Sequence, residues 1–322
     1  MKHIRLNDLS SSSETKENLE SVQRAVLNSQ RCIVITGAGI SVSSGIPDFR
    51  SPDGLFQQLK QRYPQSVASG RDLFDATLFN DRDMVGLFYN FMGELRDLVS
   101  QASCTPTHKF IKRLDEQGKL LRCYTQNIDS LEKRIGLETA FQKPVENAES
   151  GATQAVLDKT FTKAVQLHGD LENVVCTICF TKYPFTEQLA EEFREGAPPP
   201  CPHCKEIETL RDLVGKRSIA AGVLRPDIVL YNECHPQGDV IGALSEFDLR
   251  RRPDLLIVIG TSLKIPGVKR MVKEMSRCVQ SCTMRAKRAG AGKAIFINRD
   301  DPPKGWDSVF DFFIAGDSDD AV

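Results

Sequence analysis

The sequence predicts an α/β fold, a doubly wound parallel sheet of the Rossmann-like kind with a smaller second lobe. Short apolar runs rich in Val, Ile and Leu recur along the chain, and amphipathic helical patterns lie between them. Uninterrupted apolar runs are typical of parallel strands covered on both faces, and regular alternation of strand and helix is typical of a doubly wound sheet. Residues 45–103 and 176–224 break this alternation, so we expect these two segments to form the smaller lobe.

The same patterns place the main elements. The run CIVIT predicts a buried strand over 32–36, preceded by an amphipathic helix that starts near residue 14. Further strands are expected in the apolar runs near residues 123, 257, 296 and 312. Helices are expected over residues 83–98, 107–116 and 268–279.

Composition excludes several classes of protein. The chain has 322 residues, 40% of them apolar, and a net charge of −1. A nucleic-acid-binding protein would show a basic excess, and a membrane-spanning helix would need an apolar run of ~20 residues. The N-terminus is polar and lacks the apolar core of a signal peptide. We therefore expect a soluble intracellular protein, with no membrane and no direct nucleic-acid partner.

Four cysteines in two CxxC pairs predict a zinc site. Cys176 pairs with Cys179, and Cys201 with Cys204, with 21 residues between the pairs. Each CxxC turn can direct two thiolates at one ion, and two such turns complete a closed tetrahedron that leaves no position for water. We expect this Zn²⁺ to be structural, supporting a lobe too small for a core of its own. The alternative is four free cysteines.

A glycine-rich turn follows the first predicted strand. GAGIS, residues 37–41, lets the backbone turn sharply and approach a pyrophosphate, and the helix after it offers N–H groups to anionic oxygens. Such turns also occur without a ligand. GTS at 260–262 and NRD at 298–300 also follow apolar runs. Because ligands of open α/β sheets bind outside the carboxyl ends of strands, the three strand ends together predict a nucleotide site.

Two features of the sequence have more than one interpretation. GIPDFR, residues 45–50, suits a loop with a buried Phe and a salt bridge, or a flap over the reactive end of a cofactor. His168 follows the apolar run AVQL and precedes Gly169. A lone histidine is usually structural, but one at a strand end near a nucleotide cleft is also a candidate general base.

In combination, these motifs resemble those of the sirtuins, which are NAD-dependent protein lysine deacylases. GAGISVSSGIPDFRS, TQNID (125–129), HGD (168–170), both CxxC pairs and GTSL (260–263) occur in this order. The resemblance covers roughly residues 30–318. The segment GVLRPDIVLYNECHPQGDVIG is similar to the fungal nuclear branch of the family, which deacetylates a lysine in the core of histone H3.

The resemblance implies roles for individual residues. The pyrophosphate of NAD would be lined by Gly37, Ala38 and Gly39. The loop over the cofactor would hold Asp48, Phe49 and Arg50, with Phe49 shielding the ribose carbon from returning nicotinamide. The ribose and the nicotinamide amide would be bound by the motif Gln126, Asn127, Ile128 and Asp129. The remaining contacts to phosphate, ribose and adenine would come from Gly260, Thr261, Ser262, Asn298 and Asp317.

The resemblance also implies a reaction. His168 and Asn127 would be the catalytic residues, and Val229 and Leu230 would pair with the substrate peptide. The acetyl oxygen attacks the ribose 1′ carbon and nicotinamide leaves. His168 then takes a proton from the ribose hydroxyls, and that oxygen attacks the alkylamidate. The products are free lysine, nicotinamide and O-acetyl-ADP-ribose. A nuclear location and a role in silencing chromatin follow from the branch resemblance alone.

Elements and resemblance together divide the chain. We expect a polar N-terminal segment and helix over 1–30 and the catalytic domain over 31–322. The Rossmann-like lobe would comprise 31–50, 104–172 and 223–322, the helical insertion 51–103, and the zinc module 173–222. One position departs from the family: most sirtuins have Phe-Gly-Glu after the peptide-pairing strand, and this chain has Tyr231, Asn232 and Glu233. Because Asn tolerates positive φ better than other residues with a side chain, we expect a small effect on the turn.

Two alternatives accompany the main hypothesis of an NAD-dependent histone deacetylase. One keeps the fold but transfers another acyl group, or ADP-ribose to protein. An acidic acyl group would need a Tyr and an Arg in the acyl pocket, for which Tyr63 and Arg71 are candidates. The other alternative is a non-catalytic NAD-sensing chromatin scaffold, and the presence of His168, Asn127 and Asp129 argues against it. The sequence does not indicate an oligomeric state.

Overall fold

The computed structural model describes residues 1–322 except 7–12, 52–53, 64–70, 147–152 and 282–291. Among the described residues, seven strands form one parallel sheet in the order β1-β12-β11-β10-β2-β3-β6. Their bounds are β1 Lys2–Arg5, β2 Cys32–Thr36, β3 Leu120–Thr125, β6 Ala164–Gln166, β10 Leu255–Ile259, β11 Lys293–Asn298 and β12 Phe312–Ala315. The strand order runs outward in both directions from β2 and β10, which is typical of a doubly wound sheet and confirms the predicted fold class.

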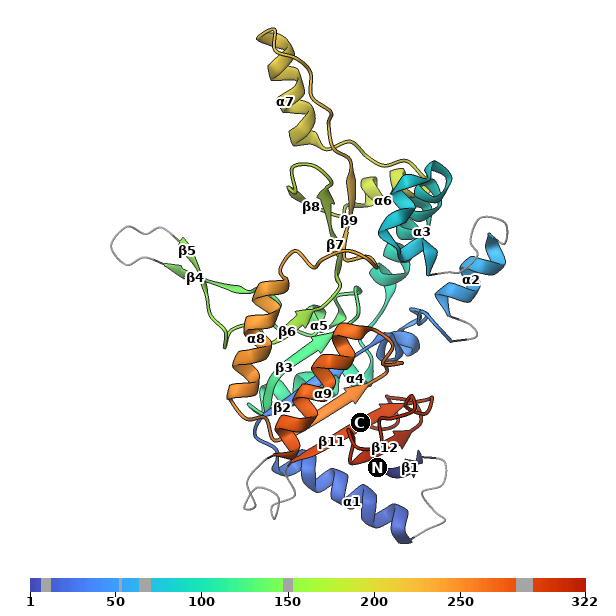
Figure 1. The fold of residues 1–322 in the computed structure, drawn as a ribbon, viewed down its shortest axis with the longest axis vertical. Coiled ribbons are helices and arrows are strands. Elements are labelled where there is room, and N and C mark those ends of the chain that lie inside the picture. The colour runs from blue at the N-terminus through green and yellow to red at the C-terminus, as the bar shows by residue number, and fades with distance from the viewer. Residues whose placement is uncertain (7–12, 52–53, 64–70, 147–152, 282–291) are drawn as a thin grey trace.

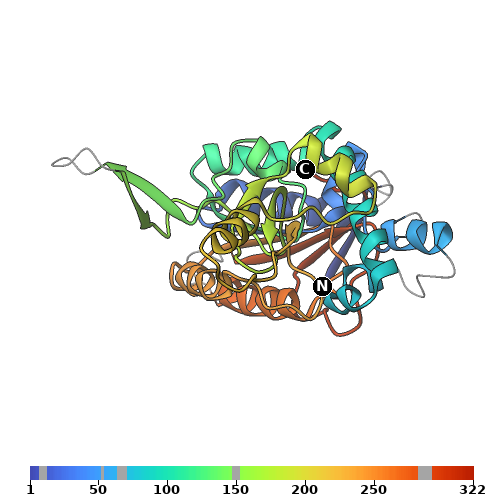
Figure 2. The same cartoon turned by 90° about the horizontal axis from the view of Figure 1, so that it is seen from above.

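Helices cover both faces of this sheet, which explains its uninterrupted apolar strands (Figure 2). Cys32 and Val34 of β2 pack with α1 (Ser13–Asn28) and α4 (Pro106–Glu116) on one face. Ile33 and Ile35 of the same strand pack with α8 (Gly238–Arg250) and α9 (Pro266–Gln280) on the other. Successive residues of β2 thus pack into two separate hydrophobic cores, one on each face of the sheet.

The predicted helices are confirmed, with slightly wider bounds. The pattern over 83–98 lies in α3 (Arg82–Gln101), which begins where the Asp81 carboxylate accepts hydrogen bonds from two backbone N–H groups of the first turn. The pattern over 107–116 lies in α4, and that over 268–279 lies in α9; both helices have proline at their start.

Strand β1 is an addition that sequence analysis missed. It pairs in parallel with β12 at the edge of the sheet, and Ile4 is fully buried there. The strand has four residues, of which three are exposed. One apolar side chain in four gives no alternation or apolar run from which a strand could be predicted.

The two segments that interrupt the strand–helix alternation share one hydrophobic cluster. In α3, Tyr89 is fully buried; its ring lies 4.7 Å from that of Phe193, and its hydroxyl donates to the Leu224 carbonyl at 2.8 Å. The short helices of this lobe are α2 Leu55–Arg62, η3 Asp72–Phe74, η4 Ala76–Asn80, α6 Glu187–Arg194 and α7 Pro202–Leu213, whereas η2 (Ala38–Ser44) follows β2 at the edge of the main sheet. The helices α3 and α6, which 85 residues separate in the sequence, therefore belong to one small lobe beside the sheet.

A small antiparallel sheet in the order β8-β7-β9 connects the lobes. Its strands are β7 Gly169–Cys176, β8 Lys182–Pro184 and β9 Leu224–Ile228. Figure 1 shows α7 at the far tip of the molecule, opposite α1, with the hairpin of β4 (Gln142–Glu146) and β5 (Thr153–Leu157) projecting from the side. The short helix α5 is Leu131–Arg134. None of the described helices combines the length and apolar character that crossing a membrane requires.

Candidate functional site

The predicted cofactor residues gather at one edge of the parallel sheet. Residues 37–41 follow β2, residues 126–129 follow β3, and residues 260–262 follow β10, three strands that are neighbours in the sheet. Asn298 is the last residue of β11, next to β10. Since all of these strands are parallel, their carboxyl ends meet along one edge, where ligands of open α/β sheets bind.

The glycines after β2 are needed for contact between two strand ends. The Gly39 N–H donates to the Gly260 carbonyl at 2.9 Å, and the Gly37 N–H donates to the Ile259 carbonyl at 3.0 Å. A Cβ at either glycine would lie 2.7 Å from a backbone atom of Gly260. Gly260 itself has a φ of +63°. Gly37 and Gly39 are therefore required for close backbone packing against Gly260. Their N–H groups are bonded to carbonyls of residues 259 and 260.

A polar contact joins the ends of β3 and β10. The Gln126 side-chain amide donates to the Thr36 carbonyl at 3.0 Å and to the Thr261 hydroxyl at 2.9 Å. The Gln126 backbone N–H donates to the same Thr36 carbonyl at 3.0 Å. These bonds hold the segments after β2, β3 and β10 in one rigid edge.

Asn127 and Asp129 lie on the buried floor of the site, joined by Ser41. The Ser41 hydroxyl donates to Asp129 Oδ2 at 2.7 Å and accepts from Asn127 Nδ2 at 3.2 Å. Asp129 Oδ1 accepts the Leu131 N–H at 3.0 Å. Asn127 is 3% exposed, and its Oδ1 has no hydrogen-bond partner among the described residues. A buried acceptor without a donor fits a ligand that supplies an N–H or O–H, such as a carboxamide or a ribose hydroxyl.

His168 stands beside this floor with a defined tautomer. Its Nδ1 lies 2.9 Å from the Gln126 carbonyl oxygen, which can only accept, so Nδ1 carries the proton. The other ring nitrogen, Nε2, is then the basic one. Burial lowers the pKa of His168, against the opposing effect of the Gln126 hydrogen bond, and the charges of His235 and Arg50 lower it further. The ring is therefore neutral near pH 7, as a general base requires.

Gly169 explains how the chain leaves His168. Its φ is +77°, and a Cβ there would lie 2.1 Å from the Asp227 carbonyl oxygen. The Val229 N–H donates to the His168 carbonyl at 2.9 Å. Only glycine lets β7 start directly against β9 at this point, and this contact fixes the backbone of His168.

Among the described residues, Arg50 and His235 are the charged or titratable groups that shift the pKa of His168. Arg50 comes from the GIPDFR loop, where Asp48 Oδ1 accepts the backbone N–H groups of Arg50 at 2.8 Å and Ser51 at 2.7 Å. His235 was missed by sequence analysis, because 67 residues separate it from His168 and only the fold brings the two together.

Phe49 packs into the smaller lobe. Its ring makes edge contacts with Phe56 and Phe74, with ring centroids 5.7 Å and 5.2 Å apart. The partly buried Phe49 fits the first interpretation of GIPDFR, but none of the ion pairs within the described part of the chain includes Arg50, whose charge instead lowers the pKa of His168.

The remaining predicted cofactor residues differ in their surroundings. Ile128 is buried in the cluster of the smaller lobe, and its carbonyl accepts the Leu171 N–H at 3.0 Å. Asn298 donates from Nδ2 to the Asp300 carbonyl at 3.0 Å. Asp317 is half-exposed and forms an ion pair with Arg299. Asn298 and Asp317 thus lie at the exposed end of the site, on β11 and just after β12.

The predicted peptide-pairing residues have few free backbone groups. The Val229 N–H is taken by His168, and the Leu230 N–H donates to Glu233 Oε2 at 2.9 Å. The Leu230 carbonyl accepts the Glu233 N–H at 3.2 Å. Within the described residues, the Val229 carbonyl accepts no such backbone bond from a loop or turn. The Val229 carbonyl is therefore an acceptor that no described backbone N–H of a loop or turn uses.

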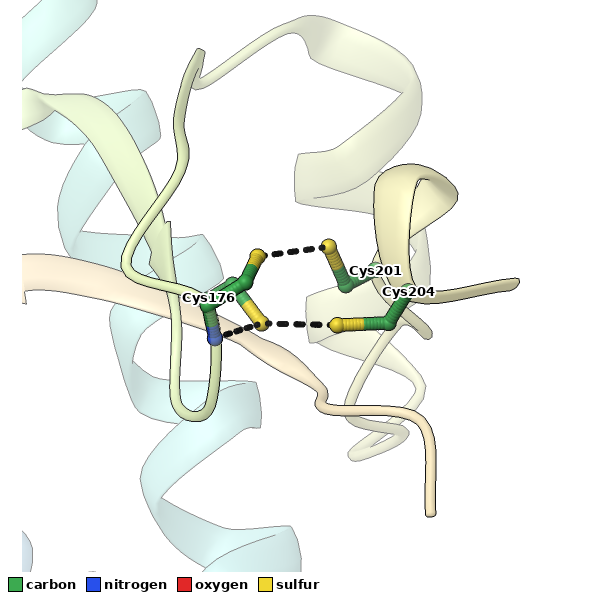
Figure 3. A group of neighbouring side chains, drawn as sticks. Cys176, Cys201 and Cys204 are labelled. Carbon is green, nitrogen blue, oxygen red and sulfur yellow. Dashed lines mark hydrogen bonds between the residues drawn. The ribbon is translucent and has the colours of Figure 1, made fainter. Parts of the chain in front are cut away.

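Four cysteines form the predicted metal centre (Figure 3). The Sγ atoms of Cys176, Cys179, Cys201 and Cys204 all lie within 4.8 Å of one another. Across the two turns, Sγ of Cys176 is 3.7 Å from Sγ of Cys204, and Sγ of Cys179 is 3.6 Å from Sγ of Cys201. The Ile178 and Cys179 N–H groups both donate to Cys176 Sγ at 3.4 Å, which fixes the position of this sulfur in the turn. Four convergent sulfurs fit Zn²⁺ and leave no open position.

Tyr63 and Arg71 have separate partners. The Tyr63 hydroxyl lies 3.4 Å from Asn90 Oδ1 in the smaller lobe. The Arg71 guanidinium lies 4.3 Å from the ring centroid of Tyr231. The contacts of the described residues therefore do not join them in one acidic-acyl pocket.

Sequence analysis missed a second buried cluster, which consists of His108, Asp129 and Glu132. His108 Nε2 or Nδ1 and carboxylate oxygens of Asp129 and Glu132 lie within 4.8 Å of one another. His108 is fully buried at the start of α4, where it forms a capping box with Thr105. Burial first, and then the charge of Asp129, raise the pKa of Glu132 to about 7. His108 is separated from Glu132 by 24 residues, and no local sequence pattern connects them.

Comparison with known proteins supports this description. Residues 37–146 and 152–267 match the Sir2 family. The chain is 39% identical to the NAD-dependent histone deacetylase HST3 of Candida albicans, over 96% of this chain and 62% of the relative. It is 40% identical to the NAD-dependent protein deacetylase hst4 of Schizosaccharomyces pombe, over 93% of this chain and 67% of the relative. The chain thus spans about two thirds of the length of these relatives, or slightly less.

Solved structures agree with the fold. A Sir2 protein with a p53 peptide and NAD+ superposes with a TM-score of 0.62 at 25% identity, over 94% of this chain and 93% of that one. Sir2Tm bound to a propionylated peptide gives a TM-score of 0.62 at 24% identity, over 93% of each chain. The residues that match the Sir2 family model make up most of this chain. They include His168, the buried polar floor and the four cysteines. This chain belongs to the Sir2 family.

Proposed function

We propose that this protein is an NAD-dependent protein lysine deacetylase. The observation that carries the proposal is His168, a neutral imidazole whose Nε2 is left basic by the Gln126 carbonyl, next to the floor of Asn127, Ser41 and Asp129. Family membership and the deacetylase names of the relatives support the same reaction. NAD would be a co-substrate, supplying the ribose carbon that accepts the acetyl oxygen and the nicotinamide that leaves.

The residues of the chain would bind, orient and move a proton. Asn127 Oδ1 would accept a hydrogen bond from the nicotinamide carboxamide or a ribose hydroxyl, because it is buried and has no partner. Asp129 would hold Ser41, which orients the Asn127 amide. His168 Nε2 would take a proton from a ribose hydroxyl, making that oxygen nucleophilic. Phe49, whose ring contacts Phe56 and Phe74, would shield the reacting carbon.

The substrate would bind beside Val229. The Val229 N–H is bonded to the His168 carbonyl, and the Val229 carbonyl would accept the N–H of the acetylated lysine or of the peptide backbone. Leu230 would contribute apolar contact, since its own backbone groups are bonded to Glu233. Backbone pairing gives affinity with little demand on sequence, so specificity for one lysine would arise elsewhere on the surface.

The finer assignment is an acetylated lysine in the core of histone H3, in the nucleus. It is supported by the similarity to the histone deacetylase HST3 and by the segment at 222–242 that resembles the fungal nuclear branch. The Zn²⁺ would be structural, since all four sulfurs converge and none of the proposed steps uses the metal.

Release of nicotinamide from NAD tests the proposal. Wild-type protein is incubated with acetylated and unacetylated H3 peptides from the tail and the core, beside His168→Ala. The control is His3→Ala, an exposed histidine on the edge strand. We expect acetyl-dependent release that His168→Ala abolishes and His3→Ala retains, with a core peptide as the best substrate.

Other outcomes select the alternatives. Release that is faster with a longer or an acidic acyl group would replace deacetylation by another deacylation. Labelling of protein by ADP-ribose would indicate ADP-ribosyl transfer. NAD binding without release from any acyl peptide would overturn the enzyme assignment in favour of a non-catalytic NAD-sensing scaffold.

A further inference from the structure

Three segments of the chain meet at the guanidinium of Arg50. Its Nη1 donates to the Ser262 hydroxyl at 2.7 Å, and its Nη2 donates to the Tyr231 hydroxyl at 2.7 Å. Arg50 belongs to the loop after η2, Ser262 to the segment after β10, and Tyr231 to the segment after β9. One cation thus connects the end of β10 to the segment that follows β9.

The position of the Tyr231 hydroxyl is set by the smaller lobe. The Tyr231 N–H donates to the Phe74 carbonyl at 2.8 Å, and its carbonyl accepts the Ala76 N–H at 3.0 Å. The Arg71 guanidinium covers the ring at 4.3 Å. Through these backbone bonds and the cover of its ring, Tyr231 offers Arg50 an acceptor whose position depends on the segment 229–231.

Arg50 keeps its positive charge available. Both anchors are neutral hydroxyls, and none of the ion pairs among the described residues includes Arg50. A guanidinium has five N–H donors, so donors remain after these two bonds. Its charge also reaches His168, whose pKa it lowers. A guanidinium held in this way suits an anionic ligand at the same edge, such as a pyrophosphate.

The segment that carries Tyr231 also touches the proposed base. Two residues before Tyr231, the Val229 N–H donates to the His168 carbonyl. Val229, Leu230 and Tyr231 therefore span from His168 to the smaller lobe, and a peptide beside Val229 would lie against the segment that holds Arg50.

We infer that the Tyr231 hydroxyl is a positioning group that holds Arg50 toward the cofactor and couples cofactor binding to peptide binding. The inference rests on the proposed function for the identity of the two ligands. A peptide that orders residues 229–231 also orders the acceptor of Arg50, and an anion that binds Arg50 orders the same segment. Because coupling between two sites is reciprocal, each ligand raises the affinity for the other by the same factor.

The test is a double-mutant cycle read by equilibrium binding. The probe is ADP-ribose, titrated calorimetrically with and without a saturating acetylated H3 peptide, so that no turnover occurs. The variants are Tyr231→Phe, Arg50→Ala and their combination. Tyr231→Phe removes one oxygen and retains the ring under Arg71.

We expect Tyr231→Phe to weaken ADP-ribose binding about 10-fold, the lower end of the range of one hydrogen bond to a charged group. It should also remove most of the increase in affinity that the peptide causes. In the Arg50→Ala background the same substitution should have no further effect, because the hydroxyl acts through Arg50. Ser262→Ala, which removes the second anchor, should weaken binding in the same direction.

Tyr63→Phe is the matched control, since it removes a hydroxyl that faces Asn90 instead of Arg50. Equal melting temperatures of the variants would show that folding is retained. Unchanged ADP-ribose affinity in Tyr231→Phe, or an effect that adds fully to that of Arg50→Ala, would overturn the inference. Failure of the proposed function is a separate result: wild type would bind ADP-ribose yet release no nicotinamide, while the cycle would still report on Tyr231.

Discussion

Nδ1 of His168 lies 2.9 Å from the backbone carbonyl oxygen of Gln126, so the residue that joins the ends of β3 and β10 also sets the tautomer of the proposed base. The carbonyl can only accept, which leaves Nε2 of the neutral ring unprotonated. Because the bond comes from the backbone, no substitution of the Gln126 side chain removes it directly. The base is therefore oriented by the fold of the strand end.

The pH dependence of turnover should report the pKa of His168. Burial lowers this pKa below the usual 6.5, and the neutral form is the active one. The rate constant kcat/KM should therefore fall as the pH drops through a value below 6.5 and should be constant near pH 7. Nicotinamide release measured from pH 5 to 8.5 checks this. An acidic limb centred above pH 6.5 would contradict it.

Substitution of Ser41 should impair catalysis without unfolding the protein. Ser41→Ala removes the group between Asp129 and Asn127, so the Asn127 amide loses its orientation and Asp129 loses a donor. We expect a loss of about 10- to 100-fold in kcat/KM, the range for a hydrogen bond to a buried charge. The control is Ser43→Ala, whose hydroxyl bonds Asp319 in an exposed position. Similar losses in both variants would refute a specific role for Ser41.

The sequence predicted the sheet and the zinc centre because both leave local patterns. Apolar runs identify β2, β10 and β11, and CxxC spacing identifies all four cysteines. Gly37 and Gly39 were correctly placed at a strand end, but their packing against Gly260 is a contact between distant segments that no local motif shows.

What the sequence could not predict depends on contacts between distant side chains. Arg50 is 181 residues from Tyr231, and His108 is placed beside Asp129 only by the packing of α4 on the sheet. A single serine, histidine or tyrosine gives no periodic signal. Such residues become interpretable only when their partners and their burial are known.

Loss of the metal centre should destabilise the smaller lobe. Cys204→Ser replaces one of four convergent sulfurs, and the other buried thiols would then lack a complete metal site. We expect bound zinc to fall from one ion per chain to a small fraction, and the melting temperature to fall by several degrees. Metal analysis and thermal unfolding by circular dichroism check this. Cys278→Ser, outside the cluster, is the control, and equal zinc content in both variants would exclude the assigned site.

Replacement of Asn232 by glycine should destabilise the protein less than replacement by alanine. Its φ is +67°, as expected where the family has glycine, and its side chain donates to Asp75 Oδ2 at 2.7 Å. Asn232→Ala keeps the strained conformation and loses this bond, at a cost of about 1–2 kcal/mol. Asn232→Gly loses the bond but relieves the strain, so we expect a change under about 1 kcal/mol. Chemical denaturation of both variants compares the two, and equal losses would show that the backbone conformation is unimportant.

Glu132 should make the stability of the protein depend on pH. Its pKa rises from 4.5 to about 7 in the folded protein, so between these values the folded state binds a proton that the unfolded state has lost. This contribution to the free energy of unfolding therefore decreases as the pH rises from about 4.5 to about 7, and it is constant above that. His108 acts in the opposite direction, because burial lowers its pKa and the unfolded state then binds the extra proton below about 6.5.

The variant Glu132→Gln separates the contribution of Glu132 from that of His108. Glutamine imitates the protonated carboxyl and retains an acceptor for the Thr36 hydroxyl. Relative to wild type, this variant should gain about 1–3 kcal/mol in the free energy of unfolding between pH 5 and pH 8. Urea unfolding at both pH values measures the difference, with Glu17→Gln on the exposed face of α1 as the control. If the difference between Glu132→Gln and wild type is the same at both pH values, Glu132 is ionised in the folded state throughout. Its cluster with His108 and Asp129 would then hold a full carboxylate pair.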